Sequence, residues 1–100
     1  LKQAEQLLKA DNKTAFFEEI ERVSWTYLSD RLSIPTAQLN KENIAQILSN
    51  KGVSQTVIGE LHRVLTTAEF ARYAPTSDHA MQDMYNDTTN IINQLENAKL

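Results

Sequence analysis

Few side chains in this 100-residue sequence have a type and spacing that could bind a metal ion. The two histidines, His62 and His79, lie outside any H-E-x-x-H or similar spacing. Asp78, Asp83 and Asp87 form an acidic row, but they lack the alternating ligands, central glycine and final glutamate of an EF-hand loop. We expect the two histidines to be surface or partly buried side chains and not metal ligands. We expect the aspartates to form a solvated acidic face near the start of a helix, where negative charge is favourable. Neither a metal nor another cofactor is expected.

Signatures of catalysis are missing as well. The chain has no cysteine, and none of its serines lies in a G-x-S-x-G motif. No glycine-rich loop could hold a phosphate group. Neighbouring carboxylates such as Glu18 and Glu19 fall along a predicted helix surface and do not indicate a cleft. We therefore predict that the chain is not an enzyme.

One segment has the order of a helix-turn-helix motif, namely NIAQILSNKGVSQTVIGELHRVL, residues 43–65. Its first part is longer than the compact motif usually has. Its second helix carries no lysine or arginine before Arg63, and the whole chain has a net charge of -3. A helix–glycine–helix corner is common in α-helical domains, so DNA binding remains only the less favoured alternative.

The elements that would position these residues are predicted to be helices. Glycine and proline each occur only 2 times, which favours long helices over the many turns of a β protein. Apolar residues recur at three- and four-residue spacing, which predicts helices over 1–10, 13–32, 41–50 and 55–73 and a last helix from about residue 78 to the C-terminus. The expected fold is a single all-α domain over residues 1–100, a compact bundle of about five helices without strands. No apolar run approaches the 18 or so residues of a membrane span.

Helix boundaries are signalled by capping residues. Asp11 or Asn12, then Asn40 and Ser54, are suited to begin the second, third and fourth helices. Gly52 suits the end of the third helix, where a left-handed residue is common.

The sequence pattern also predicts two features of the interior. The apolar residues of the second helix cover more than one stripe, which predicts neighbours on two sides, and Gly59 either permits a close helix crossing or is simply tolerated.

The stretch EFARYAP, Glu69 to Pro75, ends the fourth helix with an unusual arrangement. At about 100° per residue, Arg72 continues the apolar stripe, while Phe70 falls on the opposite side. A guanidinium directed toward the core needs carboxylate or backbone-carbonyl partners, so we expect Arg72 to be an end-of-core anchor. Glu69, three residues earlier, is the nearest candidate partner, and Asp30 and the acids of the last helix are the others. Phe70 and Tyr73 either cover a second layer formed by the last helix or, with Trp25, form an exposed surface that docks a partner.

The sequence contains five short motifs: W-x-Y-L-x-D-R-L at residues 25–32, I-P at 34–35, L-N-K-E-N-I at 39–44, G-V at 52–53 and E-F-A-R-Y-A-P at 69–75. Together they resemble the C-terminal region of BatD-like aerotolerance (oxygen-tolerance) proteins of bacteria. The resemblance covers about residues 13–95. Thr26 stands where the family usually has a small residue or glycine, and Thr76 stands where a glycine often follows A-P.

This resemblance implies a helical domain without enzymatic activity, on the cytoplasmic side of a bacterial inner membrane and tethered by a transmembrane helix outside this chain. It implies protein partners of two kinds, MoxR-type AAA+ ATPases and von Willebrand factor A domain proteins, in a system linked to oxygen or envelope stress. Because the chain begins with Leu1, already within a predicted helix, we expect it to be part of a longer protein. The expected function is protein–protein interaction, and the alternative is a structural or oligomerisation element.

Overall fold

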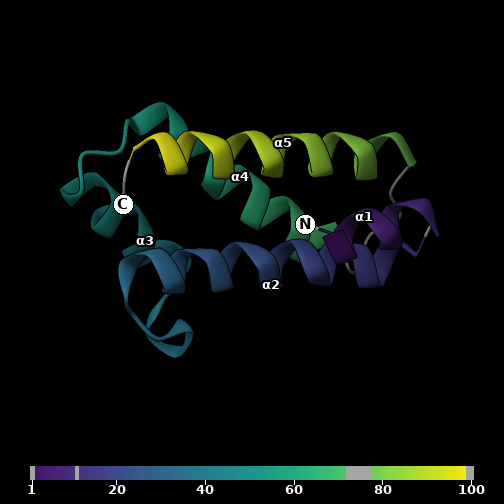
Figure 1. Cartoon of the computed structure of the whole chain (residues 1–100), viewed down its shortest axis with the longest axis horizontal. Helices are drawn as coiled ribbons and strands as arrows, with labels where there is room; N and C mark the ends of the chain where they lie inside the picture. Colours follow the sequence, from purple (N-terminus) through teal and green to yellow (C-terminus); the bar gives the residue numbers. More distant parts are fainter. Residues whose placement is uncertain (1, 11, 72–77, 99–100) are drawn as a thin grey trace.

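The computed structural model describes residues 2–10, 12–71 and 78–98, and every regular element within them is helical (Figure 1). In chain order these elements are α1 (Lys2–Lys9), α2 (Lys13–Leu32), the short 3-10 helix η1 (Thr36–Gln38), α3 (Lys41–Asn50), α4 (Gln55–Ala71) and α5 (Asp78–Asn97). The prediction of an all-α bundle with five helices is thereby confirmed. The expected extension of α4 to Tyr73 lies outside the described residues.

The longest helices, α2 and α5, run along the long axis of the molecule, and α4 passes between them (Figure 1). α2 contacts α1, η1, α4 and α5, which confirms the expectation that it has neighbours on more than one side. The radius of gyration is 13.2 Å, close to the ~13 Å expected for a compact domain of this length. Among the described helices, none has the length and apolar character needed to cross a membrane.

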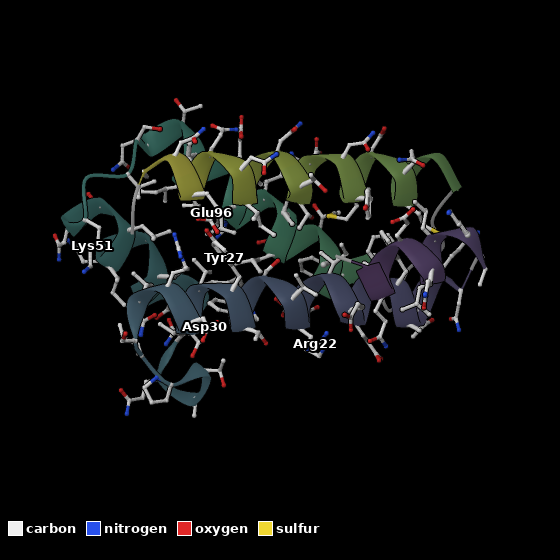
Figure 2. All side chains as sticks on the ribbon, viewed as in Figure 1. Arg22, Tyr27, Asp30, Lys51 and Glu96 are labelled. Atoms are coloured by element: carbon white, nitrogen blue, oxygen red, sulfur yellow. The ribbon has the colours of Figure 1, made fainter. Side chains whose placement is uncertain are left out.

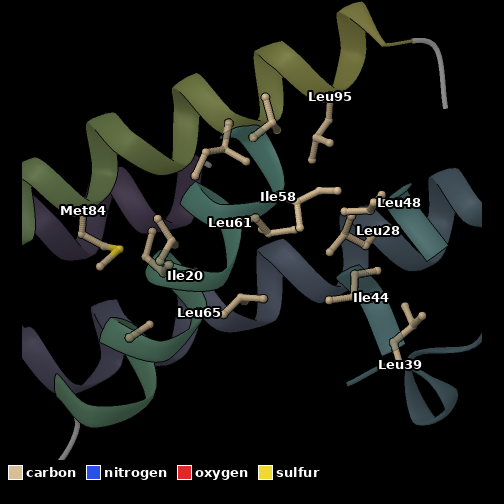
Figure 3. Close-up of a cluster of buried hydrophobic side chains, with 14 of the residues drawn as sticks. Ile20, Leu28, Leu39, Ile44, Leu48, Ile58, Leu61, Leu65, Met84 and Leu95 are labelled. Atoms are coloured by element: carbon tan, nitrogen blue, oxygen red, sulfur yellow. The ribbon is translucent and has the colours of Figure 1, made fainter. Parts of the chain in front are cut away.

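The core lies where α2, α4 and α5 face one another. Ile20 and Leu28 of α2, Leu61 and Leu65 of α4, and Leu95 of α5 are buried there (Figure 3). The 3-10 turn brings Leu39 inward and leaves this side chain only 9% exposed. The buried residues of α4 recur every three or four positions, so this helix turns one apolar face toward the common core.

The helix starts follow the capping signals. The side chain of Asn12 accepts a hydrogen bond from the Ala15 amide at 3.3 Å, so Asn12, the second of the two candidates, caps α2. Asn40 and Asn43 form a reciprocal capping box at the start of α3, and Ser54 accepts from the Val57 amide. Each cap satisfies a backbone N–H that has no partner within its helix.

Both ends of the η1–α3 segment are defined by a left-handed residue. After α3, Gly52 has a φ of 87°, and the Val53 amide reaches back to the Leu48 carbonyl at 3.1 Å in a Schellman motif. After α2, the same role falls to Ser33, with a φ of 57°, although the sequence offers no glycine there. The Ser29 hydroxyl supports this turn by donating to the Ile34 carbonyl.

Candidate functional site

The residues considered for metal or acid–base chemistry do not come together in the described part of the chain. His62 lies exposed on α4, and no group of three histidine, aspartate or glutamate side chains converges among the described residues. Asp83 is exposed, whereas Asp87 is half-buried and receives a hydrogen bond from Arg63 at 3.0 Å. The side chains of residues 78–80, including Asp78 and His79, lie outside the described set.

The adjacent carboxylates Glu18 and Glu19 have different surroundings. Glu18 is exposed, but Glu19 is only 6% exposed and is bound by the guanidinium of Arg22, whose Nε donates at 2.8 Å. This hydrogen bond lowers the pKa of Glu19, outweighing the opposing effect of burial, and the charge of Arg22 lowers it further. The carboxylate is therefore held ionised by a structural partner one turn away.

The end of α4 differs in part from the arrangement expected around EFARYAP. Glu69 is joined to Lys41 of α3 by an ion pair of 2.6 Å, which the sequence analysis did not anticipate. Asp30 is exposed and forms no ion pair with another described residue. Arg72 lies outside the described residues, so its predicted pairing with Glu69 or Asp30 stays a prediction.

Phe70 is a large apolar residue of α4 that does not pack into the core. Its side chain is 64% exposed, and it is the only large hydrophobic residue of the described chain that is exposed. Trp25, the second candidate for the interaction surface, is half-buried and packs against the core. Tyr73, the third, lies outside the described residues. The exposure of Phe70 thus favours the hypothesis that it belongs to an interaction surface. Trp25 instead packs at the edge of the core.

Gly59 lies on the same outer face of α4 as Phe70. Eleven residues bring the helix back to within about 20° of its starting direction, about 16 Å further along the axis. Gly59 is exposed, and a methyl group placed on it would meet nothing within 4 Å. The proposed close crossing between helices within the molecule is therefore wrong, and packing does not require glycine here. We call the exposed strip that contains Gly59, Arg63 and Phe70 the outer face of α4.

Arg63, the single cation in the second helix of the possible DNA-binding motif, is already engaged. It is held by Asp87 of α5 beside a polar groove between α4 and α5. Carboxylate and amide groups line the rest of this groove: Glu60, Asn90, Asn93 and Gln94. These carboxylate and amide side chains do not favour phosphate binding, which needs further cations. They do not favour metal binding either, which needs further acidic side chains.

A polar cluster between α2 and α5 was not found from the sequence. The Arg31 guanidinium donates to Glu96 at 2.6 Å and lies 6.0 Å from the centre of the Tyr27 ring. Tyr27 and Glu96 face each other between the two helices (Figure 2). Burial raises the pKa of Tyr27, and the carboxylate of Glu96 raises it further against the opposing charge of Arg31. No local sequence signal joins residues 65 positions apart.

The site with the best structural support is therefore the outer face of α4, centred on Phe70, rather than a cleft with reactive groups. Its exposure could be anticipated from the helical wheel, because Phe70 is opposite the apolar stripe. Comparisons with protein-family models, with curated proteins and with solved structures each gave no match to this chain.

Proposed function

We propose that this chain is a non-enzymatic protein–protein interaction domain that uses the outer face of α4. The observation that carries the proposal is the 64% exposure of Phe70 on an otherwise regular amphipathic helix. Aromatic side chains are enriched among the residues that dominate binding energy at protein interfaces. A rigid helix also presents such an anchor without the entropy cost of ordering a loop.

The glycine on the same face supports this proposal. Gly59 costs α4 up to about 1 kcal/mol relative to alanine, and no neighbouring group in the described structure makes up for that cost. A partner that approaches the backbone at Gly59 would explain why the larger residue is avoided. Phe70 would then anchor the partner three turns further along the helix.

The proposed partners follow from the resemblance to BatD-like aerotolerance proteins. They are a MoxR-type AAA+ ATPase and proteins with a von Willebrand factor A domain. We further propose that the domain works at the cytoplasmic side of a bacterial inner membrane, tethered through a helix outside this chain, in tolerance to oxygen or envelope stress. The motifs at residues 25–32, 39–44 and 69–75 support this proposal.

The proposal is tested by measuring binding of the purified domain to each of the two partner classes by calorimetry. Phe70→Ser should weaken binding by about 30-fold, as loss of a residue worth about 2 kcal/mol implies. Gly59→Ala should raise the melting temperature yet also weaken binding. The matched control is Lys51→Ser, which changes an exposed residue in the turn after α3. Failure of both partner classes to bind, or equal binding by wild type and Phe70→Ser, would remove the support for this function.

The same exposed phenylalanine makes self-association the second candidate function. Two copies that bury Phe70 against each other would form a structural or oligomerisation element. Sedimentation velocity over a wide concentration range distinguishes the two functions. A monomer at high concentration excludes self-association, whereas a dimer that Phe70→Ser dissociates supports it.

A further inference from the structure

A row of carboxamide side chains lies on the exposed side of α5, which forms one edge of the molecule (Figure 1). We call Asn90, Asn93, Gln94 and Asn97 the amide row. All four are exposed, and none of their side chains has a hydrogen-bond partner among the described residues. Asparagine is a poor helix former, because its side chain competes with the backbone for hydrogen bonds. The stability of α5 therefore does not explain three asparagines on one exposed face.

Most of the amide row belongs to the polar groove between α4 and α5. Asn90, Asn93 and Gln94 line this groove, together with Glu60 of α4. The groove has a volume of about 310 Å³, at the lower end of the range for ligand sites, so it suits a short segment of a ligand. The three unpartnered carboxamides are therefore gathered in a hollow and do not stand alone on a convex surface.

The spacing of the amides matches an extended polypeptide. Asn90 and Gln94 are four residues apart, which separates them by about 6 Å along the helix axis. In an extended chain, every second residue presents its N–H and C=O to the same side, with a repeat of about 6.8 Å. A carboxamide can donate to the C=O and accept from the N–H of one such residue. Successive turns of α5 can therefore hold alternate residues of one extended segment.

The charges of the groove favour a cationic ligand. Arg63 and Asp87 form an ion pair of 3.0 Å across the groove, so their charges compensate each other. Glu60 is half-buried and forms no ion pair with a described residue. It leaves one negative charge, which a lysine or arginine of the ligand would neutralise.

We propose that this groove binds an extended segment of a partner protein that carries a lysine or arginine. Asn90 and Gln94 bind the backbone of alternate residues, Asn93 adds a further donor and acceptor, and Glu60 binds the cationic side chain. The site lies beside the outer face of α4 but does not use Phe70. It goes beyond the proposed function and stands independently of it.

The test titrates the isotopically labelled chain with a threonine octapeptide that has one central lysine and blocked ends, in the absence of any partner protein. Proton–nitrogen NMR spectra resolve the side-chain NH₂ groups of asparagine and glutamine. We expect the signals of Asn90, Asn93 and Gln94 to shift and to saturate at millimolar peptide. A peptide N-methylated at alternate residues cannot donate to the carboxamides, so it should bind about 10-fold more weakly. Glutamate in place of the lysine should also weaken binding.

The double substitution of Asn90→Ala with Gln94→Ala should weaken binding about 10-fold while α5 stays folded, because alanine is the better helix former. The matched control is Gln82→Ala with Asn86→Ala, which removes the same residue types at the same spacing. The side chains of this control pair are joined at 3.1 Å and do not line the groove. Glu60→Gln should remove the preference for lysine over glutamate in the peptide. An absence of side-chain shifts at millimolar peptide, equal binding of the N-methylated peptide, or equal affinities of the two double variants would overturn the inference.

Discussion

Glu19 and Tyr27 lie on the same helix, but their surroundings favour the charged form of Glu19 and the neutral form of Tyr27. Glu19 is held in its charged form by Arg22, whereas Tyr27 is held in its neutral form by burial and by Glu96. Each pKa shift changes the stability of the folded state, so each gives a dependence of stability on pH that can be measured.

The lowered pKa of Glu19 predicts a loss of stability in acid. Its contribution is complete above the ordinary value of 4.5 and is lost as pH falls through the lower pKa of the folded state. Glu19→Gln should therefore reduce the free energy of unfolding near pH 7 and flatten its decline below pH 4.5. Urea unfolding at a series of pH values measures this. Glu18→Gln, at the exposed neighbour, should leave the profile unchanged, and equal profiles for all three proteins would contradict the assignment.

The raised pKa of Tyr27 predicts a loss of stability in alkali. Its contribution is present below the ordinary value of 10 and is lost as pH rises toward the higher pKa of the folded state. Ultraviolet absorbance of the phenolate should show one tyrosine that titrates late and is missing in Tyr27→Phe. Glu96→Gln should lower the pKa of Tyr27, because the carboxylate is one of the causes that raise it. A late titration unaffected by Tyr27→Phe would refute the assignment.

Residue-level features could be predicted where their cause is local. Asn40 and Ser54 were identified as caps because each acts on an amide two or three residues away. The pairs Lys41–Glu69 and Arg31–Glu96 join residues 28 and 65 positions apart, and only the packing of helices brings them together. Phe70 was assigned to the face opposite the core, but whether another layer covered it depended on the tertiary structure.

At the scale of elements, the end of α2 stores a small strain. Ser33 adopts a left-handed conformation that costs an L-residue about 1–2 kcal/mol, whereas glycine adopts it freely. Ser33→Gly should therefore stabilise the domain by up to about 1 kcal/mol, after allowance for the greater freedom of glycine in the unfolded chain. Thermal unfolding measures the change. Ser33→Ala keeps the strained conformation and serves as the control, so an equal gain in both variants would disprove the explanation.

Element boundaries could be predicted closely because stop signals coincide with the ends of apolar periodicity. α2 and α3 begin and end at the expected residues, since Pro35 and Gly52 follow them and Asn12 and Asn40 precede them. The close crossing suggested for Gly59 was wrong, because a glycine within a helix has the same local pattern whether it faces a neighbour or solvent. Only the placement of surrounding helices distinguishes the two cases.

At the scale of the whole molecule, one core receives side chains from α1 to α5, so a defect at its centre should affect the entire fold. Leu28 is completely buried on the helix with the most neighbours. Leu28→Ala should cost about 2–5 kcal/mol and lower the melting temperature by about 10 °C or more. Asp30→Ala, two residues further on the exposed side of α2, is the control. Similar melting temperatures for the two variants would show that the core is not shared as described.

The all-α class and the central place of α2 could be predicted because both follow from apolar periodicity. The crossing of α4 between α2 and α5 depends on how side chains of different size interlock. That detail arises from packing across the whole domain and has no signature in a single segment.

The position of α3 has a consequence for how the domain opens. Among the helices, α3 has its backbone close to α4 alone, and left-handed turns at Ser33 and Gly52 separate its segment from α2 and α4. We therefore expect α3 to detach from α4 at less cost than global unfolding. Native-state hydrogen exchange should show α3 amides exchanging through a partial opening, while the Leu61–Leu65 turn of α4 exchanges only when the whole domain unfolds. Equal protection in both would mean that the domain opens as a single cooperative unit.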